Sequence, residues 1–319
     1  MKNIISKLMK YFVDPDYRFE VNLSMGKYNN MDDEEFIRLL WKRFYGKNDG
    51  TTVGLPELNL QNPQTLCEKL QWLKLYYRKP EMTIMVDKYR VKEYVSKIVG
   101  EEHVIPTIGV WDKADDIDIS TLPDKFVLKC THSSGGMITC RDKNLFDFRA
   151  AKTFLSKILK RNHYFSAREW PYKDVQPRII AEPLIEQLGT ISSTEYKLTC
   201  MNGHVAFVSI CTGVAHTDFD KRWNDHYDPD FNKLEWYVNY RPAPLAPEKP
   251  RKWNDLIAFC EKLCGDFPYV RVDTYMIDEK IIFGEYTFFT WGGFMKFNPK
   301  EWDLKLGRML ELPKTKTSL

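Results

Sequence analysis

The sequence predicts an α+β fold in which helices accompany mainly antiparallel sheets. From about residue 105 onward, short apolar runs typical of strands alternate with helical segments. Asn202-Gly203 separates two of these runs, and an Asn-Gly pair between strands is a strong signal for a two-residue hairpin turn. Strands joined by hairpins pair antiparallel, so these observations argue against a doubly wound parallel sheet.

Length, composition and charge limit the possible functions. The 319 residues suffice for two domains, or for one large α/β unit with extensions. Hydrophobic residues make up 43% of the chain and aromatic residues 14%, which predicts a sizeable core and excludes a disordered chain. The formal net charge of +3, from 47 basic and 44 acidic residues, argues against a nucleic-acid partner.

The cysteines indicate a reducing compartment. Seven of them stand singly in apolar runs, and no CxxC pair occurs in the sequence. Such an odd, scattered set is typical of buried thiols and argues against disulfides or a structural zinc site. We therefore expect a cytoplasmic protein.

Residues 1–60 predict a helical N-terminal extension that ends in a linker. The first apolar residues fall on one face of a short amphipathic helix: Ile4, Ile5, Leu8, Met9 and Phe12. This face either docks on the protein body or makes peripheral contact with an anionic membrane surface. Lys7 and Lys10 interrupt the segment, which is too short and too charged for a signal peptide or a membrane span. A second helix covers Asp32 to Phe44, closed by Gly46, and GKNDGTTVGLPELN reads as the linker.

Residues 61–122 predict an N-terminal α/β part. Asn62-Pro63 favours the start of a helix through Leu73, and another helix covers about Ile84 to Ile98, closed by Gly100. Further helices are expected at about residues 144–161 and 250–265. The runs typical of strands are IPTIGVW, KFVLKC, GMITC, RIIAEPLI, TEYKLTC, HVAFVSICT, YVRVDTYMI and KIIFGEYTF.

The segment YVRVDTYMIDEKIIFGEYTFF predicts a hairpin with a polar face. Alternation places Arg271, Asp273 and Tyr275 on one face of its first strand. In the second strand the face is formed by Phe283, Glu285 and Thr287. A tight turn around residues 278–280 then sets Asp273 opposite Glu285, and Arg271 opposite Thr287.

A carboxylate pair at facing positions of a hairpin calls for a cation. Two carboxylates about 5 Å apart repel by about 3 kcal/mol at an effective dielectric near 20, and like charges directly opposite are normally avoided. Magnesium takes oxygen ligands, usually one or two carboxylates together with substrate phosphates. Asp273 and Glu285 are therefore candidate magnesium ligands. The alternatives are that Arg271 neutralises the pair structurally, or that one carboxylate faces solvent.

The segment KFVLKCTHSSGGMITC suggests a phosphate site. Lys129 ends an apolar strand, and the loop after it carries Ser133, Ser134, Gly135 and Gly136, whose backbone N–H groups suit phosphate oxygens. The Walker A pattern GxxxxGK[ST] is absent, and a plain hairpin turn is the alternative interpretation.

Three other positions are candidates on weaker grounds. Lys88 lies on a predicted helix, where a lysine is ordinarily a surface residue, whereas Lys197 stands in the middle of a strand. Glu182-Pro183 interrupts the strand RIIAEPLI, and the freed backbone groups either read an adenine edge or mark the end of an edge strand.

In this order the segments resemble the ATP-grasp superfamily. VDKYRVKEYV looks like the helix with the first nucleotide lysine, FVLKCTHSSGG like the strand and flap with the second, and IIAEPLI like the adenine hinge. VRVDTYMIDEKIIFGEYTFFTWGG is similar to the Arg-x-Asp and Glu-x-Asn strands of D-alanine–D-alanine-ligase-like members. The resemblance covers about Leu70 to Phe297. More narrowly, QWLKLYYRKP, REWPYK, PRIIAE, EYKLTCMNG and FPYVRVDTY resemble the TupA-like, teichuronopeptide-type branch, which is associated with bacterial surface polysaccharides.

The resemblance implies two α+β lobes whose antiparallel sheets grip ATP. The small lobe with its Gly/Ser flap would span residues 123–180, and the large lobe with the metal site residues 181–319. Lys88, Lys129, Ser133, Ser134, Gly135 and Gly136 would bind phosphates, Glu182 and Leu184 would lie at the adenine, and Glu195 at the ribose. Asp273, Glu285 and Thr287 would hold Mg2+, Arg271 would stabilise the tetrahedral intermediate, and Lys197 would contact phosphate or substrate. Two positions depart from the family pattern: Thr287 replaces an Asn, and Trp291 replaces a Pro.

The implied function is an ATP-dependent carboxylate–amine ligase that acts through an acyl phosphate in surface-polysaccharide biosynthesis. Its cofactors would be ATP and Mg2+, and its substrates small or glycan-linked carboxylates and amines. One alternative is a glycosyltransferase of the same pathway, for which Asp228-Pro229-Asp230 supplies an Asp-x-Asp string, although its polar surroundings favour a turn. The other alternative is a non-catalytic partner that binds ATP or a glycan.

Overall fold

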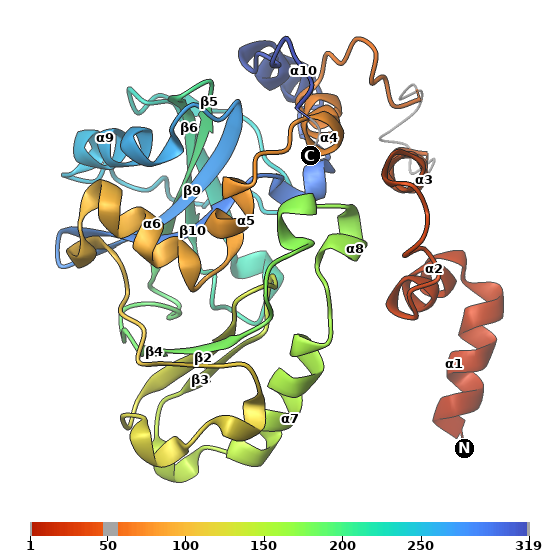
Figure 1. Cartoon of the computed structure of the whole chain (residues 1–319). Helices are drawn as coiled ribbons and strands as arrows, with labels where there is room; N and C mark the ends of the chain where they lie inside the picture. The colour runs from red at the N-terminus through yellow and green to blue at the C-terminus, as the bar shows by residue number, and fades with distance from the viewer. Residues whose placement is uncertain (1, 47–56, 318–319) are drawn as a thin grey trace.

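Two antiparallel sheets form the centre of the molecule. The structure, a computed structural model, describes residues 2–46 and 57–317. The small sheet has the strand order β1-β4-β2-β3 and the large sheet the order β10-β9-β5-β6-β7-β8. Every pair of neighbouring strands in these sheets is antiparallel, which confirms the predicted α+β class. In Figure 1 the small sheet lies below the large one.

All eight predicted strand runs are present as strands, and the described part of the chain contains two further strands that were not predicted. The small sheet contains β1 (Gly109–Trp111), β2 (Phe126–Cys130), β3 (Met137–Cys140) and β4 (Ile179–Pro183). The large sheet contains β5 (Thr194–Met201), β6 (His204–Thr212), β7 (Trp223–Tyr227), β8 (Lys233–Leu234), β9 (Tyr269–Ile277) and β10 (Lys280–Thr287). The unpredicted β7 and β8 flank Asp228-Pro229-Asp230, which forms the turn expected there.

Helices surround the sheets. They are α1 (Lys2–Val13), α2 (Pro15–Ser24), α3 (Asp33–Tyr45), α4 (Leu66–Tyr76), α5 (Glu81–Val86), α6 (Arg90–Val99), α7 (Phe148–Leu159), α8 (Tyr164–Ala167), α9 (Trp253–Cys264) and α10 (Glu301–Met309). Short 3₁₀ turns connect them, at Glu101–His103, Ala114–Asp116, Ile119–Thr121, Lys143–Leu145, Trp170–Tyr172, Phe219–Lys221 and Thr290–Gly293. Helix α7 packs on the small sheet and α9 on the large one, so each sheet has its own hydrophobic core.

Two predicted helices differ from those in the structure. Helix α4 does not begin at Asn62-Pro63, because Thr65 is its N-cap residue. The Thr65 hydroxyl accepts from the Glu68 backbone N–H, and the Glu68 carboxylate accepts from the Thr65 backbone N–H. The helix predicted through Lys88 is broken into α5 and α6. The Asp87 carboxylate accepts from the backbone N–H groups of Tyr89 and Arg90, and Lys88 lies on a turn rather than on a helix.

The β9–β10 hairpin has the predicted register. Asp273 pairs with Glu285 and Arg271 with Thr287. The turn residues between the strands, Asp278 and Glu279, both have positive φ, as a two-residue turn of type I′ requires.

A bulge corrects one detail of this hairpin. Gly284 is left unpaired, and Phe283 therefore pairs with Thr274 and does not share the face of Glu285. A Cβ atom at Gly284 would lie 2.9 Å from the Asp273 carbonyl oxygen, so the close approach of the two strands depends on glycine.

Helix α3 packs against the body through Ile37 and Trp41, whereas α1 stands apart at its side in Figure 1. The apolar face of α1 was predicted either to dock on the body or to contact a membrane surface. Docking is wrong for Leu8, Met9 and Phe12, because these residues are 52%, 65% and 70% exposed. The side chains of Ile4 and Ile5 and most of the expected linker, residues 47–56, lie outside the described part. No helix within residues 2–46 and 57–317 is long and apolar enough to cross a membrane.

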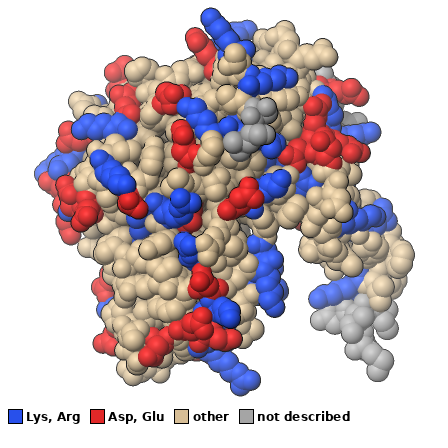
Figure 2. All heavy atoms as spheres, viewed as in Figure 1, with Lys and Arg blue, Asp and Glu red and all other residues tan. Residues whose placement is uncertain are grey.

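The predicted division at residues 60, 122 and 180 stays a prediction. Strand β1 comes from the segment 61–122, and β4 crosses the boundary at 180, yet both belong to the small sheet. On the face shown in Figure 2, basic side chains alternate with acidic ones, in keeping with the near balance of charge.

Candidate active site

A cavity of about 360 Å³, here called the inter-sheet cavity, lies between the two sheets and is lined by side chains from both. Its lysines are Lys88, Lys92, Lys129 and Lys197. Its carboxylates are Glu182, Glu195, Asp273 and Glu285. Most of the residues that sequence reasoning singled out are thus brought together from segments far apart in the chain.

The acidic pair of the hairpin is held by cations. Asp273 accepts from Arg271 Nε at 2.6 Å and Nη2 at 2.7 Å, and Lys197 Nζ lies 3.2 Å away. Glu285 accepts from Lys88 Nζ at 2.8 Å. The Lys88 ammonium lowers the pKa of Glu285 to about 2, so this carboxylate is ionised at neutral pH. Burial alone would lower the pKa of Lys197, but the Asp273 carboxylate raises it above its usual range.

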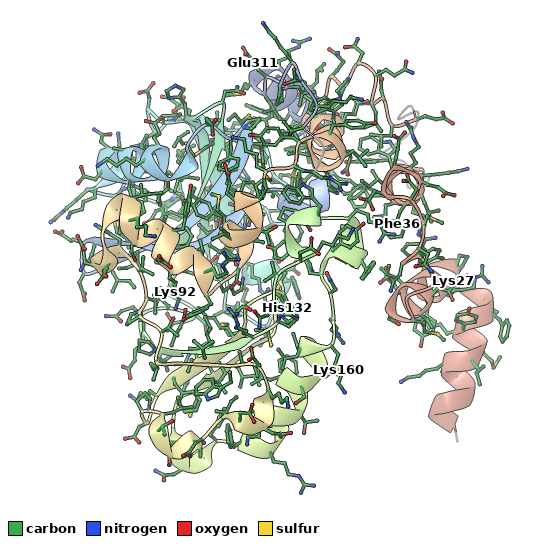
Figure 3. The ribbon with its side chains drawn as sticks, viewed as in Figure 1. Lys27, Phe36, Lys92, His132, Lys160 and Glu311 are labelled. Atoms are coloured by element: carbon green, nitrogen blue, oxygen red, sulfur yellow. The ribbon has the colours of Figure 1, made fainter. Side chains whose placement is uncertain are left out.

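A second ion cluster faces the hairpin from the small sheet. The buried Glu182 lies 2.6 Å from Lys129 Nζ and 2.5 Å from Lys92 Nζ. Burial opposes ionisation of Glu182, but these two ammonium groups lower its pKa. Lys92 points from α6 toward the small sheet (Figure 3). Sequence reasoning missed Lys92, because a single lysine on a helix carries no signal of a partner that only the fold brings to it.

The predicted flap forms the loop between β2 and β3. Ser134 and Gly135 line the inter-sheet cavity, whereas Ser133 is buried and its hydroxyl donates to the Gly135 carbonyl at 3.4 Å. Gly135 and Gly136 both have positive φ, and a Cβ at Gly136 would lie 2.9 Å from Ser133 Oγ. The loop is joined to the Lys88 turn, because the Lys88 N–H donates to the Thr131 carbonyl at 3.1 Å.

Three other predicted site residues lie beside this cavity rather than in its wall. Leu184 lines a separate shallow depression next to Ile282. Arg271 borders the neighbouring cavity, and Thr287 holds it there by accepting from Arg271 Nη2 at 3.0 Å. The hairpin register that pairs Arg271 with Thr287 therefore also orients the guanidinium.

One cross-strand row continues the site over the large sheet. Glu285, Asp273, Lys197, Ser209 and His226 occupy successive facing positions on β10, β9, β5, β6 and β7. Ser209 Oγ lies 2.9 Å from His226 Nδ1. Burial lowers the pKa of His226 to about 3, so its ring is neutral at physiological pH and a poor proton acceptor.

A second cavity, of about 230 Å³, lies over the far end of this row. We call it the aromatic cavity because ring-bearing side chains line it: Phe207, His226, Trp236, Tyr240, Tyr269 and Trp291. Glu195 and Lys197 line both cavities, and Arg271 stands at the junction. A molecule in the aromatic cavity can therefore reach the charged cluster. Ser209, His226 and Trp236 gave no signal in the sequence, because they meet only through strand pairing.

The acidic pair suits magnesium that arrives with a phosphate ligand. Within residues 2–46 and 57–317, no group of three or more His, Cys, Asp or Glu residues is arranged to hold a metal ion. Magnesium needs no such group, since one or two carboxylates with substrate phosphates and water suffice. Asp273 and Glu285 meet that requirement, and three nearby cations already balance their charge.

Comparison of folds finds ligases among similar structures. D-alanine–D-alanine ligase of Helicobacter pylori is 16% identical, with 90% of this chain and 84% of that chain covered and a TM-score of 0.43. The Bacillus anthracis enzyme, solved with ATP, is 16% identical, with 64% and 55% covered and a TM-score of 0.35. L-amino acid ligase from Bacillus licheniformis is 12% identical, with 80% and 55% covered and a TM-score of 0.41. The match thus spans little more than half of the last two proteins. A comparison with curated proteins finds no match.

A family model gives the assignment. The model of the TupA-like ATP-grasp family matches residues 68–311. The matched range includes both sheets and every residue of the charged cluster in the inter-sheet cavity. The chain therefore belongs to the TupA-like ATP-grasp family.

Proposed function

We propose that this chain binds ATP with magnesium in the inter-sheet cavity and uses it to join a carboxylate to an amine. One observation carries the proposal. Four lysines from both sheets and from the α5–α6 segment converge there on a facing pair of carboxylates, and the described residues offer no cluster of three or more metal-ligating side chains that would account for them. A phosphate chain with its magnesium ion needs this combination of charges.

Each charged group has a proposed role. Lys88, Lys92 and Lys129 bind phosphate oxygens, helped by the backbone N–H groups around Gly135. Asp273 and Glu285 hold magnesium, and the Thr287 hydroxyl serves chiefly to orient Arg271. The adenine and ribose contacts expected at Glu182, Leu184 and Glu195 stay part of the proposal, with Glu182 also fixing Lys92 and Lys129.

Arg271 and Lys197 act on the carboxylate substrate. Both lie where the inter-sheet cavity meets the aromatic cavity, and each is held by Asp273. Their positive charges orient the carboxylate and stabilise the oxyanion that develops when an amine attacks the phosphorylated carboxylate and displaces phosphate. The buried position of Asp273 keeps these charges fixed and largely free of water, which strengthens their effect.

ATP with magnesium, when bound, supplies the phosphoryl group that activates the carboxylate and the positive charge that balances its transfer. The family resemblance suggests a role in the biosynthesis of a bacterial surface polysaccharide, with a small or glycan-linked acceptor.

The glycosyltransferase alternative rests on Asp228-Pro229-Asp230, and the structure offers it no support. Asp228 is engaged by Asn232, whose backbone N–H donates to it at 2.7 Å. The Pro229 carbonyl accepts from Trp253 Nε1 at 2.6 Å. None of the three residues lines either cavity.

Thermal-shift titration with a non-hydrolysable ATP analogue tests the proposal. We expect stabilisation that requires magnesium and is lost in Lys129→Ala. Lys125→Ala is the matched control, because Lys125 precedes the same strand and pairs with the exposed Glu186 outside the cavity. Stabilisation by nucleotide sugars alone would instead favour the glycosyltransferase. A chain that binds ATP but releases no phosphate with any mixture of carboxylates and amines would be a non-catalytic partner.

A further inference from the structure

The aromatic cavity adjoins the charged cluster but is chemically unlike it. Its charged lining residues are Arg222, Arg271, Lys197 and Glu195, and beyond these and Asn224 its walls consist largely of aromatic and aliphatic side chains with a few hydroxyl groups. Its volume of about 230 Å³ is many times the roughly 10–15 Å³ that one water molecule requires. The space therefore suits an organic group of the size of one amino acid or one sugar.

Trp291 stands at this cavity in an unfavourable backbone conformation. Its φ and ψ are 54° and 32°, the left-handed region that a bulky side chain rarely adopts. Its side chain is nevertheless 52% exposed, so burial in the core does not explain its presence. A strained, exposed tryptophan beside a cavity points to a ligand-binding role.

Buried polar side chains of α4 hold the turn that carries Trp291 through hydrogen bonds to its backbone. Lys74 Nζ donates to the Gly292 carbonyl at 2.6 Å, and Gln71 Nε2 donates to the Gly293 carbonyl at 2.8 Å. Both side chains come from α4 and are buried. The indole thus projects from a fixed support, and the ring of Tyr240 lies 6.4 Å from it, centroid to centroid.

We propose that the aromatic cavity binds the body of the carboxylate substrate, and that this body contains a ring which packs against Trp291 and Tyr240. The inference rests on the proposed ligase function, whose substrate it specifies. The carboxylate lies at Arg271 and Lys197, and the ring lies over the aromatic walls. Aromatic side chains bind both the apolar face of a sugar ring and a flat aromatic ring, so a uronic acid and an aromatic amino acid are the two sources of this chemistry. A short aliphatic carboxylate leaves the cavity unfilled.

Binding of carboxylates to the full chain tests the proposal directly. Isothermal titration, with and without the ATP analogue and magnesium, compares glucuronate and galacturonate with phenylalanine and tyrosine, and these with alanine and acetate. We expect at least one ring-bearing carboxylate to bind about tenfold or more tightly than alanine. Trp291→Gly should remove that advantage, whereas Trp291→Phe should largely keep it.

Glycine at position 291 separates binding from folding. Because glycine adopts positive φ without strain, Trp291→Gly should not lower the melting temperature. Phe154→Ala is the matched control, since Phe154 is a partly exposed aromatic residue on α7 outside the cavity.

Each outcome decides the proposal. Preference for uronates or for aromatic amino acids supports it and identifies the source of the ring. Equal affinity for alanine and the ring-bearing carboxylates, no binding of any of them, or an unchanged affinity in Trp291→Gly overturns it. Failure of the proposed function gives a different result, because the ATP analogue then fails to bind while ring binding still depends on Trp291.

Discussion

Lys88 Nζ donates to Glu285 Oε2 at 2.8 Å, although 197 residues separate the two in the chain. The contact joins the turn between α5 and α6 to the last strand of the large sheet across the inter-sheet cavity. In the proposed complex both groups gain new partners: Lys88 turns to phosphate and Glu285 to magnesium. The ion pair therefore holds Lys88 and Glu285 in place and neutralises the charge of each until the nucleotide binds.

Replacing Lys88 tests its proposed contact with phosphate. Lys88→Met should weaken binding of the ATP analogue by roughly 10- to 100-fold, because a hydrogen bond to a charged group contributes about 1.5–3 kcal/mol. Lys97→Met is the control, since Lys97 pairs with Glu93 on the exposed side of the neighbouring helix. Titration calorimetry measures both affinities. Equal affinities in the two variants would remove Lys88 from the site.

The depressed pKa of Glu285 predicts a stability change at acidic pH. A carboxyl group whose pKa is lower in the folded chain stabilises the fold above its ordinary pKa of 4.5, and this contribution is lost as pH falls toward about 2. The difference in unfolding free energy between wild type and Glu285→Gln should therefore shrink over that window. Solvent screening reduces its size, because the side chain is 45% exposed.

Urea denaturation at several pH values between 3 and 6 measures this difference. Glu93→Gln provides the comparison on an exposed helix face. A difference between wild type and Glu285→Gln that stays constant across the range would contradict the assignment of the low pKa to Glu285.

Buried Lys74 predicts a second rise of stability with pH, in the alkaline range. Burial lowers its pKa to about 7, against the opposing influence of Glu169 and Asp33. Between pH 7 and 10.5 the unfolded chain binds a proton here that the folded chain has released, so stability rises with pH by up to about 1.4 kcal/mol per unit. Denaturation curves at pH 7, 8 and 9 should show this rise in wild type relative to Lys74→Met. Parallel pH profiles for the two proteins would refute it.

Asp273 is the position where loss of one charge should stop turnover. Asp273→Asn removes a proposed magnesium ligand and the partner of Arg271 and Lys197, so phosphate release should fall by about a hundredfold or more. Far-UV circular dichroism should stay nearly unchanged, because the amide has the shape of the carboxylate. Asp255→Asn, on the solvent side of α9, is the control. Undiminished turnover in Asp273→Asn would exclude it as a metal ligand.

The hairpin shows what the sequence could predict. Alternation of polar and apolar residues with a two-residue turn determines a register, and Asp273 and Glu285 accordingly lie opposite each other. The bulge at Gly284 was missed because a single glycine is compatible with a regular strand. Its position depends on how closely the Asp273 backbone approaches.

The features that the sequence did not predict, strand β7 and the role of Lys92, depend on contacts between distant segments. Strand β7 carries Asn224, Asp225 and His226, residues that disfavour a strand prediction. It forms nevertheless because partners elsewhere satisfy them: Asp225 accepts from the Ala243 N–H at 2.9 Å and pairs with Lys233 at 3.0 Å. Lys92 looks like a surface lysine until the small sheet brings Glu182 to it.

The cross-strand row has a consequence for the length of the substrate. Neighbouring strands are about 4.8 Å apart, so Lys197 on β5 and His226 on β7 are separated by about 10 Å, and hydrogen bonds along both strands fix that separation. The backbone positions that frame the aromatic cavity and the charged cluster are therefore fixed relative to each other, and only side-chain rotation can change the path between them. In the proposed complex the sheet would thereby select substrates by length as well as by chemistry, so affinity should depend on the number of atoms between ring and carboxylate.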